Sequence, residues 1–351
     1  MKHLLLALLL VAGTAHAQTP LDLGALVESR CGPTGYRNPA GCTVRLGRGE
    51  YAIGATKLGT CESTLTQRLG VTIEGQGTSV FAAVPRYTTG GTTLVYKGPP
   101  GGTMLSVCGS RVYFRDLAVD GKGAGKCFEY RANNAHGAST HFGGIERVDM
   151  LDCATGISIF GETYNDQLDF LTFRDLTIRG GERCLVQDSQ QAVSNNFDNI
   201  DCASTKEGFV VRNGSAHFKD AYTGQLGEDP TYIGFYLTKT ADKTQPWMSR
   251  AMVSIQQSHM EVTHGRFIVD DSLSWYGLDL ARNGFQMIPQ KPDTEMMLIE
   301  STSPGPLLML GDWVTGGGGA NPVGRICHPR GPIEHMGVTV TPWVKLIWGC
   351  P

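Results

Sequence analysis

One six-residue pattern repeats in Phe114-Arg-Asp-Leu-Ala-Val119, Ile145-Glu-Arg-Val-Asp-Met150, Phe173-Arg-Asp-Leu-Thr-Ile178, Phe197-Asp-Asn-Ile-Asp-Cys202 and Phe218-Lys-Asp-Ala-Tyr-Thr223. Each copy has a large apolar residue, then polar residues, usually including Asp or Asn, then an apolar, a variable and a mostly apolar position. Successive copies start 31, 28, 24 and 21 residues apart. Repeats of roughly 20–50 residues indicate a solenoid, so we expect each copy to belong to one coil.

A second strand follows each copy of the pattern, at residues 127–131, 156–160, 184–188, 208–212 and 234–237. The repeat therefore predicts short strands that recur at equivalent places in each coil. Parallel hydrogen bonding would stack successive coils about 4.8 Å apart. We expect the apolar positions to face inward and to pack on the equivalent positions of the neighbouring coils.

The third position of the pattern is Asp116, Arg147, Asp175, Asn199 and Asp220. Asn and Asp tolerate the left-handed backbone conformation that a tight bend requires. These residues are therefore interpreted as bends between two strands. The three aspartates at this position are predicted to be structural rather than catalytic.

Composition limits the classes of partner. The chain has 351 residues, of which 41% are hydrophobic and 18% charged, with 46 glycines and a net charge of −3. Such a chain can bury a large core, and its many glycines suit an all-β protein with many turns. A nucleic-acid partner would require a basic face, so none is expected.

The N-terminus has the three parts of a signal peptide. Lys2 and His3 precede an apolar run at residues 4–11, and Ala15-His-Ala17 is a small-x-small cleavage site. The apolar run is shorter than the roughly 20 residues of a membrane span, and no later run is long enough. We expect a secreted or periplasmic protein that begins at Gln18 after cleavage near Ala17.

The cysteine count agrees with export, because an even number in an exported chain indicates disulfides. The ten cysteines are residues 31, 42, 61, 108, 127, 153, 184, 202, 327 and 350. Cys31 with Cys42 and Cys327 with Cys350 are the expected local pairs near the two ends. Cys184 and Cys202 occupy apolar positions of the repeat, so buried free thiols are an alternative there.

The pattern divides the chain into a signal peptide at 1–17, an N-terminal cap at 18–40, a solenoid at 41–315 and a C-terminal cap at 316–351. A short helix is expected at residues 21–30, where it can cover the open end of the core. No second domain is expected, and the sequence leaves the oligomeric state open.

Three stretches carry a family resemblance: Val44-Arg-Leu-Gly-Arg-Gly-Glu-Tyr-Ala-Ile53, Val71-Thr-Ile-Glu-Gly-Gln-Gly77 and Leu117-Ala-Val-Asp-Gly121. The chain resembles right-handed parallel β-helix proteins of the pectate-lyase-like superfamily from about residue 41 to about residue 310. The resemblance implies an all-β, single-domain right-handed parallel β-helix. Lyases, hydrolases, epimerases and tailspikes share that fold, and in the family the sheet with the second strand lines a carbohydrate groove.

Residues expected on the outer face of that sheet form a polar strip. The strand residues in it are Glu129, Arg131, Gln187, Asp188, Arg212 and Asp270. The loop residues in it are Glu162, Tyr164, Asp166 and His217. The register that places Phe209 and Val211 inward predicts Arg212 outward.

Two reactions suit such a strip, and elimination is favoured over hydrolysis. A uronate lyase requires a base and positive charge for the enolate, for which the catalytic candidates are Arg212, Asp188, Arg131, His217 and Lys206. A glycosidase requires two carboxylates about 5–9.5 Å apart, and Asp188 with Asp166 or Glu129 is the candidate pair. The substrate-binding candidates are Glu129, Gln187, Tyr164 and Asp166.

The alternative function is a non-catalytic β-helix that binds glycans or a cell surface, and a tailspike-like module is a third. The motifs of pectate lyases and polygalacturonases are missing, although Asp270-Asp271 resembles the paired acids of the latter. His259 and Glu261 share a strand face without any fixed role. No cofactor is firmly implied and no metal site is assigned, although calcium bound in the groove by Asp188 is possible; no Asp-x-Asp-x-Asp-Gly loop occurs.

Overall fold

The computed structural model describes residues 20–32, 41–61, 68–77, 91–133, 139–162, 166–238, 252–272, 277–289, 291, 294–316 and 321–351. The expected signal peptide and Tyr164 lie outside these residues.

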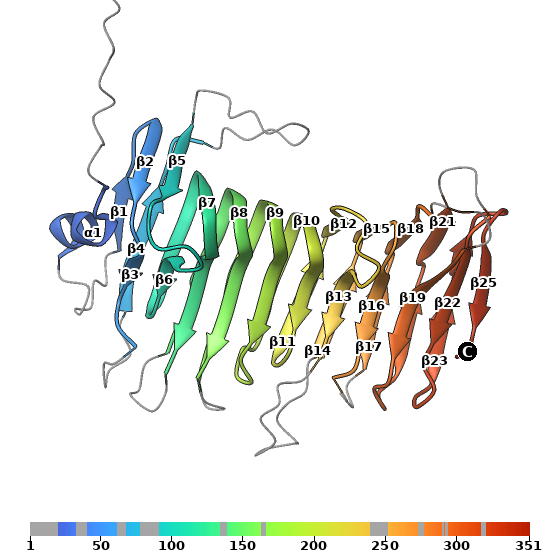
Figure 1. Ribbon diagram of the computed structural model, residues 1–351. Helices are drawn as coiled ribbons and strands as arrows, with labels where there is room; N and C mark the ends of the chain where they lie inside the picture. The colour runs from blue at the N-terminus through green and yellow to red at the C-terminus, as the bar shows by residue number, and fades with distance from the viewer. Residues whose placement is uncertain are drawn as a thin grey trace, which may run out of the picture.

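Within these described residues, one helix and 25 strands build a right-handed parallel β-helix, as predicted (Figure 1). The helix is α1 (Leu23–Cys31). Four long strands each run through all three sheets: β7 (Ser110–Ala132), β8 (Gly144–Gly161), β9 (Thr172–Asp188) and β10 (Asn195–Val211). The other strands each belong to one sheet, and the parallel pairing connects strands of the same sheet in successive coils.

The shorter strands fall into three rows. The first sheet contains β1 (Cys42–Arg45), β4 (Arg68–Glu74), β11 (Ser215–Lys219), β14 (Met252–Gln256), β17 (Leu278–Ala281), β20 (Leu307–Leu310) and β23 (Ile333–Met336). The second contains β2 (Gly49–Ile53), β5 (Thr92–Tyr96), β12 (Tyr222–Gln225), β15 (His259–Val262), β18 (Gly284–Met287), β21 (Trp313–Gly316) and β24 (Thr339–Val340). The third contains β3 (Thr56–Leu58), β6 (Thr103–Val107), β13 (Ile233–Leu237), β16 (Arg266–Asp270), β19 (Glu295–Ser301), β22 (Val323–Cys327) and β25 (Lys345–Trp348).

The bend between the first and second sheets is made by one left-handed residue per coil. The predicted bend residues all have positive φ, and the values are 57° at Asp116, 52° at Arg147, 55° at Asp175, 54° at Asn199 and 51° at Asp220. The interpretation of these residues as bends is confirmed. The same conformation recurs in the later coils, at Gln257, Arg282, Gly311 and Gly337.

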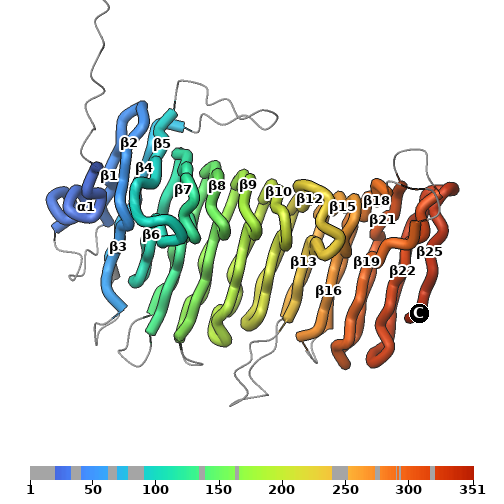
Figure 2. The backbone as a smooth tube through the Cα atoms, in the orientation of Figure 1, coloured from blue at the N-terminus to red at the C-terminus, as the bar shows by residue number. Residues whose placement is uncertain are grey.

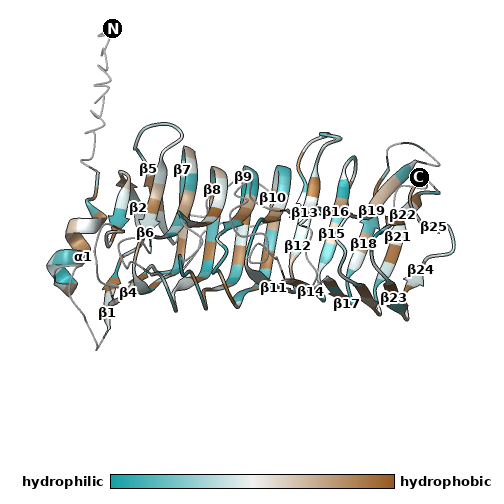
Figure 3. Cartoon of the chain, turned by 90° about the horizontal axis from the view of Figure 1, so that it is seen from below, coloured by the Kyte–Doolittle hydropathy of each residue, from teal (hydrophilic) through white to brown (hydrophobic). Residues whose placement is uncertain are grey.

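Aromatic side chains stack along the core at the spacing of the coils. The rings of Phe173 and Phe197 lie 5.0 Å apart and those of Phe197 and Phe218 lie 4.8 Å apart, both nearly parallel. These residues open successive copies of the repeat, and all are buried. Apolar and polar residues alternate along the strands (Figure 3), which places one set in the core and the other on the surface.

All ten cysteines are paired, and no cysteine is free. The two expected end pairs, Cys31–Cys42 and Cys327–Cys350, are confirmed. Cys184 and Cys202 form a disulfide, so the alternative of buried free thiols is wrong. Cys61–Cys108 and Cys127–Cys153 complete the set. Five disulfides fit an extracellular or periplasmic protein, because such compartments are oxidising.

The two ends of the solenoid differ (Figure 2). At the N-terminal end α1 buries Leu23 and Val27 against the core, and the side chain of Asp22 caps the helix by accepting a hydrogen bond from the N–H of Ala25. At the C-terminal end the pairing extends further than the sequence pattern indicates, because β22 to β25 add strands to all three sheets beyond residue 316. No helix in the described ranges has the length and apolarity to span a membrane.

Candidate functional site

The candidate site is the outer face of the third sheet, which we call the third-sheet face. One outward position is occupied on six successive coils by Arg131, Phe160, Asp188, Arg212, Thr238 and Asp271. The first three are paired directly in the parallel register, and the backbone hydrogen bonds of the last three continue it. This row therefore runs along the solenoid axis with a spacing of about 4.8 Å per coil.

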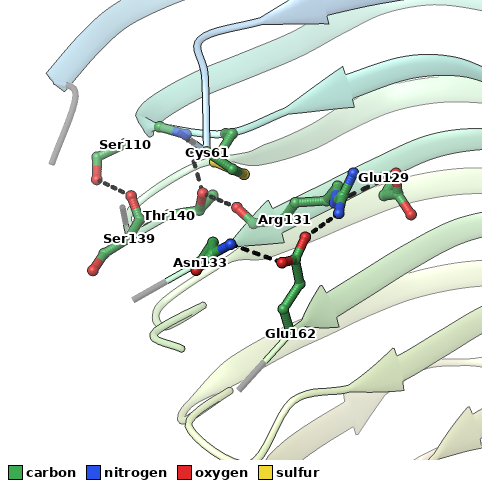
Figure 4. Close-up of a disulfide and its surroundings, with 10 residues drawn as sticks. Cys61, Ser110, Glu129, Arg131, Asn133, Ser139, Thr140 and Glu162 are labelled. Atoms are coloured by element: carbon green, nitrogen blue, oxygen red, sulfur yellow. Dashed lines mark hydrogen bonds and ion pairs between the residues drawn. A yellow bond between two sulfur atoms is a disulfide. The ribbon is translucent and has the colours of Figure 1, made fainter. Parts of the chain in front are cut away.

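Arg131 is the centre of a charged cluster at the N-terminal end of the row (Figure 4). Its guanidinium forms an ion pair with Glu162, and its Nε lies 4.0 Å from Oε2 of the buried Glu129. Asn133 donates a hydrogen bond of 2.7 Å to Glu162, and Lys126 forms an ion pair with Glu129. Two cations thus hold two carboxylates, and the cluster is closed by its own members.

Arg212 and Asp188 form the central pair of the row. Asp188 ends β9, and Arg212 directly follows β10 on the next coil. Nη1 of Arg212 donates to Oδ2 of Asp188 at 3.0 Å, and Asn213 donates to the other carboxylate oxygen at 3.3 Å. The Arg212 side chain remains 41% exposed, whereas that of Asp188 is 14% exposed. The carboxylate is therefore fixed, and the guanidinium still faces solvent.

Tyr236 and Asp271 extend the central pair. Sequence reasoning missed Tyr236 and named Asp271 only as one of two adjacent acids. Tyr236 is the outward partner of Val210 on the next coil, and its hydroxyl donates to Oδ2 of Asp271 at 3.1 Å. Burial raises the pKa of Tyr236, and the charge of Asp271 adds to the rise. The phenol is thus protonated at neutral pH. The register that places Phe235 inward would have identified Tyr236 as outward.

Three orientations expected from the sequence are wrong. Gln187 faces inward and is completely buried, because it pairs with the inward Val211 rather than with the outward Val210. Asp270 is also buried, in the same inward row. Asp166, expected in a groove loop, is buried as well, and its backbone carbonyl accepts a hydrogen bond from Ser189.

Several of the predicted catalytic residues lie apart from the central pair. His217 is on β11 of the first sheet, where its Nδ1 contacts Ser254 Oγ at 3.0 Å. Lys206 lies just before the start of the third-sheet segment of β10, at the end away from Arg212, and its Nζ forms an ion pair with Glu182 at 2.7 Å. Arg131 is three coils from Arg212, or about 14 Å along the axis. The structure therefore joins Asp188 and Arg212 and separates them from these three cations.

A metal would need several suitable side chains in one place. Among the described residues, no three His, Cys, Asp or Glu side chains are grouped so that they could hold an ion. Asp188, named above as a possible calcium ligand, is instead bound by Arg212 and Asn213.

Comparison with known proteins gives matches of fold only. No protein-family model matches the chain, and a search of curated proteins finds no match. The structure is similar to the A-module of mannuronan C-5 epimerase AlgE6 from Azotobacter vinelandii, with 15% identity, a TM-score of 0.39 and coverage of 86% of this chain and 91% of that one. The mannuronan C-5 epimerase AlgE4 A-module from the same organism is 14% identical with a TM-score of 0.41, and the match covers 94% of this chain and 95% of that one. DFA-IIIase from Arthrobacter chlorophenolicus A6 in complex with DFA-III is 11% identical with a TM-score of 0.49, and the match covers 94% of this chain and 93% of that one.

Proposed function

We propose that the chain is an exported enzyme that cleaves an acidic polysaccharide by β-elimination on the third-sheet face. The observation that carries the proposal is the exposed guanidinium of Arg212. Among the residues that the structure describes, it donates one side-chain hydrogen bond, to Asp188, and two-fifths of the side chain faces solvent. A guanidinium has five N–H donors in a planar fork, so the remaining donors can bind the carboxylate of a uronate residue.

The neighbours of Arg212 supply the other groups that elimination requires. Asp188 is a carboxylate fixed beside the guanidinium, and it serves as the base that takes the proton from the carbon next to the substrate carboxylate. Arg212 stabilises the enolate that forms. The bond from the sugar ring to the leaving oxygen then breaks, a carbon–carbon double bond forms, and Tyr236 gives its proton to that oxygen.

Hydrolysis fits the same face less well. An inverting glycosidase places its two carboxyl groups about 6.5–9.5 Å apart. Asp188 and Asp271 stand three coils apart, which is about 14 Å between backbones. Glu129 and Glu162 are closer to each other, but both are bound as carboxylates by Arg131. A hydrolase requires one of its pair as a protonated acid.

The test is to incubate the mature protein with polygalacturonate, alginate, chondroitin sulfate and neutral glucans. The near-ultraviolet absorbance of unsaturated uronates reports elimination, and reducing ends measured in parallel report any cleavage. We expect both signals to rise on an acidic polymer. Reducing ends without absorbance would replace elimination by hydrolysis, and binding without either signal would favour the non-catalytic alternative.

Arg212→Ala tests the residue assignment, with Arg266→Ala as its matched control. Both arginines belong to the third sheet, bind one carboxylate at about the same distance and are similarly exposed. Removal of a group that stabilises the transition state costs roughly a hundredfold in kcat or more. We expect that loss for Arg212→Ala alone, and equal activity of the two variants would refute the site.

A further inference from the structure

The outer face of the second sheet carries an aromatic row that the third-sheet face does not use. Tyr222, His259 and Trp313 come from β12, β15 and β21, and all three side chains point outward. The ring centroids of Tyr222 and His259 lie 5.8 Å apart, and those of His259 and Trp313 lie 5.5 Å apart, with nearly parallel planes. We call these three side chains the aromatic row.

Gly284 makes room for the last ring. It occupies the coil between His259 and Trp313, so the indole of Trp313 must lean across it to reach the imidazole. A Cβ atom at position 284 would lie 2.3 Å from Cζ2 of Trp313 and 2.9 Å from Nδ1 of His259. Any side chain there would displace the indole, so the position of Trp313 depends on this glycine.

The row is fixed on one side by polar groups. The Tyr222 hydroxyl donates to Oε2 of Glu261 at 3.0 Å, and Nε2 of His259 contacts Oε1 of Gln286 at 3.0 Å. Burial and the nearby Glu261 raise the pKa of Tyr222, so the phenol remains the donor. His259 and Glu261, which share a strand face as expected, thus contact different partners rather than each other.

Trp313 differs from the aromatic residues of the core. Its side chain is 40% exposed, whereas the stacked phenylalanines inside the solenoid are almost completely buried. Its indole N–H has no hydrogen-bond partner among the described residues. A tryptophan held at the surface with an available donor and an apolar ring is typical of a binding site.

We propose that the aromatic row, with Glu261 and Gln286, is a second carbohydrate-binding surface, which takes neutral polysaccharide. The C–H face of a pyranose ring packs on an aromatic ring, and its hydroxyl groups pair with carboxylate, amide and indole groups. The strands β12, β15, β18 and β21 contain no Lys or Arg, and Glu261 has no ion pair within the described residues. This charge disfavours acidic chains, so the ligand differs from the substrate proposed for the third-sheet face.

Affinity electrophoresis tests the proposal with hydroxyethylcellulose, galactomannan and arabinoxylan as neutral probes and polygalacturonate as the acidic one. We expect at least one neutral polymer to retard the protein. Trp313→Ala should weaken that binding about tenfold, the value of a good aromatic contact. Tyr113→Ala is the matched control, because Tyr113 is also an exposed aromatic residue, at 38%. It belongs to the first-sheet segment of β7, where it pairs with Thr72, and so lies outside both proposed surfaces.

Gly284→Val is a second variant, which keeps Trp313 but displaces its indole from the row. It should weaken binding about as much as Trp313→Ala does. Circular dichroism confirms first that the variant has the native fold. Absence of retardation by every neutral probe, or equal affinities of Trp313→Ala and Tyr113→Ala, would overturn the proposal. The result is separable from the test of elimination, which uses acidic polymers and Arg212.

Discussion

Replacement of Gln187 by leucine is expected to lower the free energy of unfolding by about 2–3 kcal/mol without changing affinity for the substrate. The Gln187 amide donates to the carbonyls of Asn213 and Ser215, at 2.9 and 3.3 Å, and accepts from Asn195 at 3.1 Å. Each lost hydrogen bond costs about 1 kcal/mol. Leucine has a similar volume and leaves no large cavity, so cavity formation adds little.

The measurement is the midpoint of guanidinium unfolding at an unchanged m-value. Gln256→Leu is the control, because that glutamine is exposed on the first sheet and its replacement should cost less than about 0.5 kcal/mol. Substrate affinity is compared on folded protein. An equal loss of stability in the two variants, or a weaker affinity in Gln187→Leu alone, would contradict the inward orientation of Gln187.

Two other predictions concern backbone strain and a buried acid. Gly311→Ala should lower the free energy of unfolding, measured in guanidinium, by about 1–2 kcal/mol. The cause is the backbone, because φ is 67° there while the added Cβ meets nothing closer than 3.8 Å. Gly54→Ala is the control and should leave that free energy unchanged, because position 54 has open space and no left-handed φ. Burial raises the pKa of Asp312 to about 6, so the folded state binds a proton more tightly than the unfolded state. Stability should therefore fall as pH rises from about 4 to about 6, by up to roughly 3 kcal/mol. Between pH 4 and pH 6, the melting temperature should fall less for Asp312→Asn than for the unmodified protein. Equal falls in the two proteins would contradict the prediction.

The fold was predictable where local chemistry repeats. A left-handed bend favours Asp and Asn for steric reasons. The bends at Asp116 and Asn199 could therefore be predicted from the local sequence, before the positions of the neighbouring coils were known. The Cys184–Cys202 bridge was not predictable in this way. It connects the third-sheet segment of β9 with the second-sheet segment of β10, and the two cysteines meet only after the coils have stacked.

The candidate site was predictable only in part. Asp188 and Arg212 lie at the ends of equivalent strands and are 24 residues apart, which makes them neighbours on adjacent coils. Gln187 and Asp270 were misplaced because polar side chains suggested an outward direction, whereas the strand register places them inward. Buried polar residues are tolerated there because hydrogen bonds satisfy them, as Ser272 and Ser301 do for Asp270.

Ion pairs between coils are in themselves weak evidence of function in this molecule. On the first sheet, Arg45, Glu74, Arg115, Glu146 and Arg174 occupy one row with alternating charge. Glu74 contacts Arg45 at 3.0 Å and Arg115 at 3.3 Å, and Glu146 pairs with Arg174. Such pairs hold the register of stacked coils. The ion pair between Asp188 and Arg212 also connects two adjacent coils, so its presence alone does not indicate catalysis.

Tyr236 separates a catalytic role from a structural one more sharply than any charged residue does. Tyr236→Phe removes one hydroxyl, whose hydrogen bond to Asp271 is worth about 1 kcal/mol of stability. Loss of a proton donor to the leaving oxygen should lower kcat roughly 10²–10⁴-fold with little change in KM. Tyr96→Phe is the control, because the hydroxyl of Tyr96, a buried residue of β5 in the second sheet, also donates one hydrogen bond of 3.0 Å, to the carbonyl of Pro99. If both variants kept full activity, the proton donor to the leaving oxygen would have to be another group, and the bond from Tyr236 to Asp271 would be a structural contact between coils.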